Sequence, residues 1–396
     1  MDIRLVIVGC GNMGKRHIGG LGRLKAIGAL PFALVGLCDP DAARLGEAQR
    51  LAESLLQTRP AAYSSLDQAL EACDAVDVTV APDLHSVLAV QALRAGCHVA
   101  VEKPMALTVR QALAMNQEAH RRRRWLAVLE NYRRDPLNRL AKALLEGDAI
   151  GSPYLMVQGS SGGGDGVILT PWRHLKSHGG IVADMGVHYA DLLEYFLGPA
   201  RHVIGMGRVV HATRLGEDGA SYAADAEDLA VGTVTFANDA VANLILNLAG
   251  RGPGWFYRAV FGTGGTLILP GDRSGRPLQL VANQIGRDSI VPESEVLGFI
   301  PDFCLDPISG RLFGADRLTH YELDWAETDA NLIASELADF ASAVADNRAP
   351  EVSGEEGVRA LALIHGFLEA GLAQRVVKMD ELVAGSLHDY QDRISV

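Results

Sequence analysis

Cysteine is scarce in this chain, and its pattern excludes structures that depend on sulfur. The 396 residues include five cysteines (Cys10, Cys38, Cys73, Cys97 and Cys304), and no two of them form a Cys-x-x-Cys pair. An odd number of thiols in apolar surroundings favours reduced, buried side chains over a disulfide framework. We therefore expect neither structural disulfides nor a bound metal ion.

Long apolar runs and an excess of basic residues are also missing. No apolar stretch reaches the length that spans a bilayer, and the sequence starts with a core strand rather than a cleavable signal, so a cytoplasmic protein is expected. Lys and Arg number 36 against 48 Asp and Glu, which gives a net charge of −12. This acidic balance argues against a nucleic acid or an anionic membrane as partner.

What the chain does have is a glycine-rich turn between an apolar strand and a helix, in the run from Leu5 to His17. Gly9 permits a tight turn, Gly11 lets the backbone approach a phosphate, and Gly14 lets the helix pack close to the strand. The free N–H groups of such a helix N-terminus bind anions. A chain with 43 glycines will contain some such spacings by chance. The prediction of a dinucleotide site therefore depends on the strand before the turn and the helix after it.

A second apolar strand, residues 32–38, is followed directly by the carboxylate of Asp39. In a Rossmann unit this position accepts hydrogen bonds from the adenosine ribose. A 2′-phosphate would be repelled by Asp39, with Asp41 close behind and no arginine directly after the strand, so NAD is expected rather than NADP. The alternative role for Asp39 is to cap a turn or helix.

Two strand patterns divide the chain. Over residues 1–129, short apolar strands alternate with amphipathic helices, which predicts an α/β Rossmann domain with a parallel, doubly wound sheet. Over residues 130–396, alternating strands between Gly-rich turns predict an α+β domain with a large, mostly antiparallel open sheet. The glycine-rich segment 159–166 is expected to be a flexible loop over the site, and an insertion-like segment covers about 285–325.

Two further motifs place polar side chains where ligands bind. Glu102-Lys103-Pro104 ends a parallel strand, so Lys103 projects at the carboxyl edge of the sheet, where open α/β folds hold their ligands. Asp184 and His188 lie four residues apart, just before a helical stretch predicted for 189–196. On a helix they share one face.

The chain resembles the glucose-fructose oxidoreductase / inositol dehydrogenase / MocA family over nearly its whole length. The family's motifs recur in order as the glycine fingerprint, Ala81-Pro82-Asp83-Leu84-His85, Glu102-Lys103-Pro104, and Gly179-Gly180 followed by Asp184 and His188. The resemblance implies NAD(P) binding in the N-terminal domain and oxidation of a secondary alcohol over the open sheet of the second. The implied cofactor-binding residues are Gly9, Gly11, Asn12, Met13, Gly14, Asp39, Ala81, Pro82, His85, Glu102 and Lys103.

The resemblance makes Lys103, Asp184 and His188 the catalytic trio, and chemistry suggests a role for each. Oxidation of a carbinol sends a hydride to the nicotinamide and the hydroxyl proton to a base, a task that suits the imidazole of His188. Cationic Lys103 would stabilise the developing alkoxide, and Asp184 would orient a neighbouring hydroxyl. The alternative for His188 is a core histidine.

Other polar and aromatic residues are weaker candidates for the walls of the site. Trp172 and Arg173 offer an aromatic face and a multidentate donor for a sugar ring, and Tyr132 follows the last strand of the first domain. A surface loop with one buried tryptophan is the alternative for the first pair. The remaining candidates are Lys176, Arg134, Tyr222, His320 and Tyr321.

The sequence thus predicts an NAD-dependent oxidoreductase acting on a sugar, glycoside or cyclitol. The glycine-rich segment 159–166 and the insertion near 285–325 favour a sugar or glycoside, although both segments can instead serve oligomer contacts. The resemblance also implies a homodimer or homotetramer formed through the C-terminal sheet. Two alternatives stay open: an NAD-cycling glycosidase that works by oxidation and elimination, and a dinucleotide-binding sensor without turnover.

Overall fold

The computed structural model describes residues 2–284 and 286–394, which divide into two compact units. The predicted division falls between residues 129 and 130 and makes the second domain one continuous segment, whereas both units here are discontinuous. The first unit contains the residues up to Arg134 with Asp306–Asp316 and Asp324–Val358, and the second contains Asp135–Leu305, Arg317–Leu323 and the residues from Arg359 onward.

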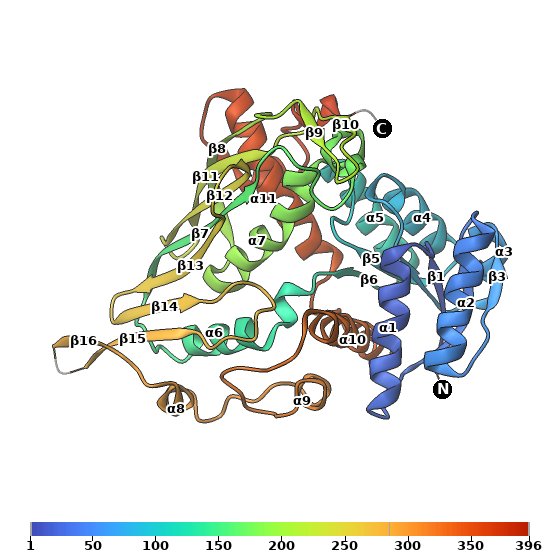
Figure 1. Ribbon diagram of the computed structural model, residues 1–396, viewed down its shortest axis with the longest axis horizontal. Coiled ribbons are helices and arrows are strands. Elements are labelled where there is room, and N and C mark those ends of the chain that lie inside the picture. The colour runs from blue at the N-terminus through green and yellow to red at the C-terminus, as the bar shows by residue number, and fades with distance from the viewer. Residues whose placement is uncertain (1, 285, 395–396) are drawn as a thin grey trace. The chain divides into compact units, whose positions relative to one another are not determined.

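The first unit is built on a six-stranded sheet in the order β3-β2-β1-β4-β5-β6, with every pair parallel (Figure 1). Leu5, Val6 and Ile7 of the central strand are completely buried, as expected for a parallel sheet covered by helices on both faces. This confirms the predicted Rossmann sheet. Its strands are β1 (Ile3–Val8), β2 (Phe32–Cys38), β3 (Ala61–Tyr63), β4 (Ala75–Val78), β5 (His98–Glu102) and β6 (Leu126–Leu129).

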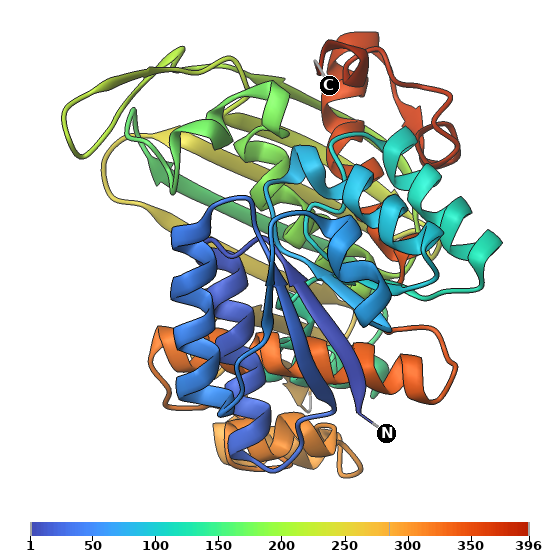
Figure 2. The same cartoon turned by 90° about the vertical axis from the view of Figure 1, so that its right-hand side faces the viewer.

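A helix from late in the sequence completes this unit. Helix α10 packs against α1 (Figure 2). A Cβ on Gly20 would lie 2.7 Å from Ile333, so the missing side chain permits the approach. Arg16 Nε also donates to Asp329 over 2.7 Å. These contacts explain why α10 belongs with the first unit. The helices are α1 (Asn12–Ala26), α2 (Ala42–Leu56), α3 (Leu66–Ala69), α4 (Pro82–Arg94), α5 (Val109–Arg122), α9 (Pro307–Phe313) and α10 (Trp325–Ala345), with 3-10 turns η1 (Leu70–Ala72) and η2 (Tyr132–Arg134).

The second unit is built on a nine-stranded sheet in the order β16-β15-β14-β13-β7-β12-β11-β8-β17. All its strand pairs are antiparallel except β7 with β12, which confirms the mostly antiparallel sheet. The strands are β7 (Pro153–Gly163), β8 (Ala200–Arg208), β11 (Leu229–Phe236), β12 (Val241–Gly250), β13 (Trp255–Gly262), β14 (Gly265–Leu269), β15 (Gln279–Gln284), β16 (Arg287–Ile290) and β17 (Val377–Lys378); β9 (Thr213–Leu215) and β10 (Ser221–Ala223) form a separate hairpin.

Helices cover one face of this sheet. Alternate residues such as Val234 and Leu244 are fully buried, and α7 approaches α11 closely because Gly186 has no Cβ to meet Ile364. Among the described residues, no helix has both the length and the apolar character needed to traverse a membrane. The remaining elements are α6 (Pro136–Glu146), α7 (Ile181–Leu197), α8 (Glu293–Val296), α11 (Gly354–Ala373), α12 (Met379–Val383), η3 (Pro171–His174), η4 (Lys176–His178), η5 (Leu297–Phe299) and η6 (Gln391–Arg393).

The glycine-rich segment 159–166 is not the flexible loop predicted for it. Residues up to Gly163 belong to β7, which pairs with β12 on one side and β13 on the other. Gly159 leaves room for the Trp255 ring, since a Cβ there would lie 2.6 Å from it. The turn that follows is held by buried Arg214, which donates to the carbonyl of Gly164 over 2.8 Å. Long-range strand pairing therefore overrides the local glycine content.

Candidate active site

The glycine turn at the start of α1 has the geometry of a phosphate-binding loop. Gly9 has φ +97°, and a Cβ there would lie 2.8 Å from Val80. A Cβ on Gly14 would overlap the carbonyl oxygen of Gly9, whereas a Cβ on Gly11 would meet nothing within 4 Å. Two glycines thus serve close packing, while Gly11 faces open space. Asn12 and Met13 are the first two residues of α1, next to that space.

The carboxylate of Asp39 follows β2 and braces the same turn. It is buried, one oxygen accepts from the N–H of Cys10 over 2.8 Å, and the other accepts from the N–H of Asp41 over 2.9 Å. The helix-capping role alternatively predicted for Asp39 belongs to Asp41, which accepts from the N–H of Ala43 at the start of α2. Asp39 therefore stands beside the glycine turn with its orientation fixed by backbone groups.

His85 connects two loops at the carboxyl edge of the parallel sheet. It is buried in α4, which begins at Pro82 after Ala81. Its Nε2 lies 3.0 Å from the carbonyl oxygen of Val80, and its Nδ1 lies 2.9 Å from that of Pro104. Burial is the main cause that lowers the pKa of His85. A direct contact with cofactor stays a prediction, but His85 already fixes the loops around it.

Lys103 follows β5 and lies close to two carboxyl groups. Glu102, the last residue of β5, accepts from the backbone N–H of Lys103 over 3.1 Å. Burial raises the pKa of Glu130 to about 7, and the positive charge of Lys103 opposes this shift. Glu130 also accepts from the N–H of Tyr132, in η2, over 3.1 Å. Lys103 and Tyr132 are thus both anchored to this group of carboxyls.

Asp184 and His188 lie one turn apart inside α7. The helix starts at Ile181, earlier than the predicted stretch 189–196, because Gly180 with φ +77° serves as its N-cap. Asp184 and His188 are 6% and 7% exposed. A separation of four residues places both on one helix face.

Arg173 joins Trp172 to Asp184 within the second unit. Its Nε lies 3.0 Å from the Asp184 carboxylate, and its Nη1 donates to Thr170 over 2.7 Å. The guanidinium also lies 4.3 Å from the centre of the Trp172 ring, which is cation–π geometry. The sequence placed Trp172 and Arg173 among the weaker candidates, and the structure ties both to Asp184.

The remaining weaker candidates pair with carboxylates inside their own units. A contact of any of them with substrate stays a prediction. The pairs are Arg134 with Asp339 and Glu351, Lys176 with Glu227, Tyr222 with Asp218, His320 with Glu293, and Tyr321 with Asp135.

Sequence reasoning missed a buried polar group around His17 in the first unit. His17 lies in the helix that follows the glycine turn and contacts Asp77 and Glu102. One available signal was Asp77, a lone charge in an otherwise apolar, fully buried strand. A buried charge requires a partner, but the sequence does not identify that partner.

Fold and side chains together define a two-unit protein with a Rossmann dinucleotide-binding unit and an open-sheet unit that carries an Asp–His pair. Residues 3–130 match the family model described as "Oxidoreductase family, NAD-binding Rossmann fold", and residues 138–268 match the GFO/IDH/MocA C-terminal domain. The two matches cover well over half of the chain. The chain therefore belongs to the GFO/IDH/MocA family, as its motifs suggested.

Individual relatives agree with this assignment. The chain is 28% identical to a levoglucosan dehydrogenase of Pseudarthrobacter phenanthrenivorans (50% of this chain, 55% of the relative) and 30% identical to a D-apiose dehydrogenase of Paraburkholderia graminis (54% of each). The matches thus span about half the length of these relatives. A structure of levoglucosan dehydrogenase with NADH and L-sorbose superimposes with TM-score 0.79 at 22% identity, covering 96% of this chain and 99% of that one.

Proposed function

We propose that this protein is an NAD-dependent oxidoreductase that transfers a hydride between nicotinamide and a secondary alcohol of a sugar, glycoside or cyclitol. The observation that carries the proposal is the pair Asp184 and His188 on one face of α7. The other unit of the chain is an NAD-binding Rossmann fold in which Lys103 directly follows β5. The names of the two relatives above support a sugar as substrate.

The side chains of the chain have separate roles in this proposal. Bound NAD supplies the hydride acceptor. His188 takes the hydroxyl proton as general base, and the ammonium of Lys103 stabilises negative charge on the substrate oxygen. Asp184 accepts from a neighbouring hydroxyl, and its ion pair with Arg173 fixes the direction of the carboxylate.

The sugar ring would be recognised by an aromatic face and polar groups beside it. The Arg173 guanidinium lies over the Trp172 ring, so the two side chains hold each other in place before substrate binds. Tyr132 is proposed as a third substrate-binding residue, with its backbone anchored to Glu130. Residues 159–163 lie in β7 rather than in a loop, so they no longer favour a larger glycoside.

The residues of the first unit fit NAD. No protein atom lies within 4 Å of a Cβ placed on Gly11, so the backbone there is open to a pyrophosphate. The N-terminal N–H groups of α1, together with Asn12 and Met13, would hold it. Asp39 would accept from the ribose hydroxyls, and the loops at Ala81 and Glu102 would complete the site. The proposed cofactor-binding set is Gly9, Gly11, Asn12, Met13, Gly14, Asp39, Ala81, Pro82, His85, Glu102 and Lys103.

Cofactor choice tests the role of Asp39. We expect kcat/KM for NAD to exceed that for NADP by at least about tenfold, equivalent to ~1.4 kcal/mol. Asp39→Asn removes the repelling charge and should narrow that ratio. Equal activity of the wild type with both cofactors would show that Asp39 does not decide the choice.

The function itself is tested by following NADH absorbance while protein and excess NAD are mixed with inositols, free sugars and glycosides. Sustained growth of the signal with one class, lost in Lys103→Ala and His188→Ala, is the expected result. Release of an aglycone without net NADH would favour the NAD-cycling glycosidase. Binding of NAD with no chemistry on any compound would favour the dinucleotide-binding sensor.

We also propose that the uncovered face of the nine-stranded sheet joins two copies of the chain. Met206, Val231, Ile245, Gly159 and Tyr257 occupy one continuous row across five strands. Met206, Val231 and Tyr257 are 57%, 37% and 39% exposed. Such an apolar row is typical of an interface between subunits.

Solution mass tests this interface. Met206→Lys with Val231→Lys should convert a dimer or tetramer to smaller species in light scattering, whereas Leu169→Lys, an exposed leucine outside the row, should not. A wild type that is monomeric at all concentrations would refute the proposal.

A cytoplasmic location is proposed as well, since all five cysteines are free thiols.

A further inference from the structure

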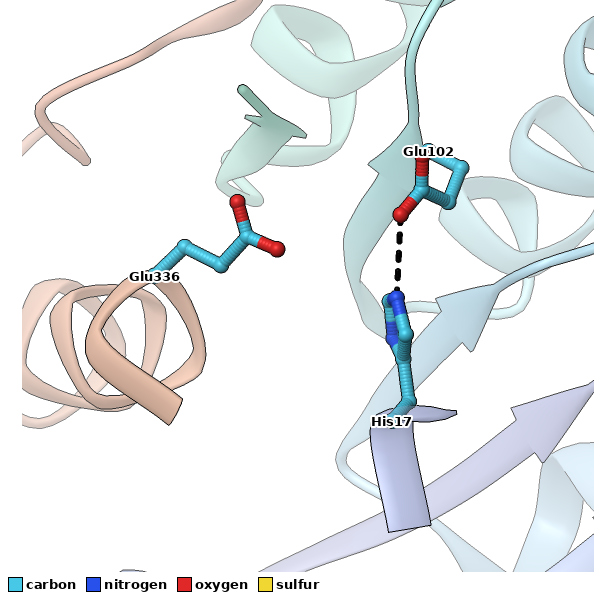
Figure 3. Close-up of side chains that lie close together, drawn as sticks. All are labelled: His17, Glu102 and Glu336. Atoms are coloured by element: carbon cyan, nitrogen blue, oxygen red, sulfur yellow. Dashed lines mark hydrogen bonds and ion pairs between the residues drawn. The ribbon is translucent and has the colours of Figure 1, made fainter. Parts of the chain in front are cut away.

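A cluster of buried charges lies between α1, β4 and β5 of the first unit. His17 Nδ1 lies 2.7 Å from a carboxylate oxygen of Asp77, and His17 Nε2 lies 3.0 Å from one of Glu102 (Figure 3). His17 and Asp77 have no exposed surface, and Glu102 is also buried. None of these contacts has a role in the proposed chemistry so far.

The two contacts define the charge of His17. A neutral imidazole has one N–H, but both of its nitrogens here face carboxylates, which only accept hydrogen bonds when ionised. Two donated hydrogen bonds require the imidazolium. Burial lowers the pKa of His17, but the charge of Asp77 and the hydrogen bonds with Asp77 and Glu102 outweigh it and raise this pKa to about 10.

The imidazolium is connected to Lys103 through Glu102. One oxygen of Glu102 faces His17, and the other accepts from the backbone N–H of Lys103. Burial alone would raise the pKa of Glu102, but the hydrogen bond and the charge of His17 outweigh burial and lower this pKa below its usual value. The carboxylate therefore stays ionised. Since His85 contacts the carbonyl of Pro104, Lys103 is anchored on both sides.

Glu336 raises the question of a metal ion. His17, Glu102 and Glu336 each offer a ligand atom within 4.8 Å of the others, and within the described part of the chain neither oxygen of Glu336 has a hydrogen-bond partner. In Figure 3 the Glu336 carboxyl points toward the other two side chains. However, both ring nitrogens of His17 already face carboxylates, so a metal ion would have to displace one of these contacts and its proton. Burial and the charge of Glu102 raise the pKa of Glu336 well above its usual value, which favours a neutral carboxyl.

We propose that His17 is a positioning residue: as an imidazolium held between Asp77 and Glu102, it keeps the Glu102 carboxylate on the backbone N–H of Lys103 and so fixes Lys103 at the end of β5. The effect on turnover rests on the proposed function, because it assumes that Lys103 contacts the reacting oxygen. The charge of His17 and its effect on Lys103 do not depend on that assumption.

Two amide variants separate the two hydrogen bonds of His17. An asparagine amide can replace the Nδ1 donor toward Asp77, and a glutamine amide can replace the Nε2 donor toward Glu102. We expect His17→Asn to lower kcat by about tenfold to a hundredfold, as a misplacement of roughly 1 Å does, with KM and NAD affinity changed much less. His17→Gln should retain most of kcat. Equal losses in both folded variants, or no loss in either, would overturn the positioning role.

Nuclear magnetic resonance tests the cluster without turnover. In ¹⁵N-histidine-labelled wild type, the ring nitrogens of His17 should carry the imidazolium signature from pH 6 to 9. His174 is the internal control: its Nε2 accepts from the N–H of Ile168 over 2.9 Å, and burial lowers its pKa to about 4, so it should stay neutral. A neutral His17 overturns the proposal, and so does stoichiometric zinc or manganese in elemental analysis that His17→Asn removes.

The signal of Lys103 completes the test. Lysines labelled with ¹³C by reductive methylation give separate signals, and Lys103→Arg identifies the one of interest. We expect His17→Asn to shift this signal and its titration, and His17→Gln to leave both near the wild type. If no polyol is oxidised by the wild type, the proposed function fails while this shift still supports the positioning role; an unchanged Lys103 signal in His17→Asn overturns it.

Discussion

The two units hold their functional groups in different ways. In the first unit, backbone geometry and sealed hydrogen bonds dominate: Gly9 and Gly14 have no room for a Cβ, and His17 lies between two carboxylates. In the second unit, Asp184 and His188 extend from one helix, and Asp184 is already paired with Arg173. Substitutions at the packed glycines of the first unit should therefore lower stability and weaken cofactor binding together, whereas substitutions at the Asp–His pair of the second unit should impair chemistry and keep the fold.

The largest expected effect is on turnover by His188→Gln. Removing a general base typically costs ~10²- to 10⁴-fold in rate, and a glutamine of similar size on a helix should leave the melting temperature nearly unchanged. Steady-state kinetics beside thermal denaturation measures both. The matched control is His202→Gln on β8, whose ring contacts Thr235 rather than the proposed site. A His188→Gln variant with normal kcat would contradict the expectation that substitutions in the second unit impair chemistry.

The next effect concerns the backbone of the first unit. A Cβ on Gly14 overlaps the Gly9 carbonyl, so Gly14→Ala should lower the free energy of unfolding by about 1–3 kcal/mol, as overpacking does, and weaken NAD binding as well. Gly11→Ala is the control, because no protein atom lies within 4 Å of the added Cβ. It should change stability little while still hindering the phosphates. Calorimetry and NAD titration give the two values, and equal destabilisation by both variants would contradict this account.

A smaller effect is expected from Arg173→Gln in the second unit. The change removes the charged contact with Asp184 and the cation on Trp172, so KM for the polyol should rise about tenfold, the loss expected for one charge-assisted hydrogen bond. NAD affinity should not change. Arg251→Gln is the control, since its exposed guanidinium pairs with Asp165 outside this group. An increase in the NAD dissociation constant instead would place Arg173 with the cofactor.

Local sequence patterns predicted the first unit better than the second. A parallel strand buried on both faces is apolar throughout, and a glycine fingerprint has a fixed spacing, so both can be recognised from neighbouring residues. Residues 159–163 are also rich in glycine but form part of a central strand, because Trp255 and β12 select small residues there. Such a constraint comes from a strand nearly a hundred residues away.

The candidate site shows the same division. Lys103, Asp184 and His188 were identified from motifs whose members lie within a few residues of each other. The link from Arg173 to Asp184 had only a weak signal, and the cluster of His17 with Asp77 and Glu102 had none that named its partners. These partners come from α1, β4 and β5, and only the folded sheet brings them together.

A pH dependence of stability distinguishes the cluster of His17, Asp77 and Glu102 from an ordinary histidine. The pKa of His17 is raised from 6.5 to about 10, so its contribution to stability is complete below pH 6.5 and is lost as pH rises toward 10. The stability difference between wild type and His17→Gln should therefore shrink with pH, with a slope approaching ~1.4 kcal/mol per pH unit above pH 7.5. Urea denaturation at pH steps from 7 to 9 measures this slope. Glu130, with its pKa raised to about 7, titrates at the lower edge of this range and is present in both proteins. A difference that stays constant over the range would mean that His17 is neutral in the folded protein, and the first unit would then hold its site by packing alone.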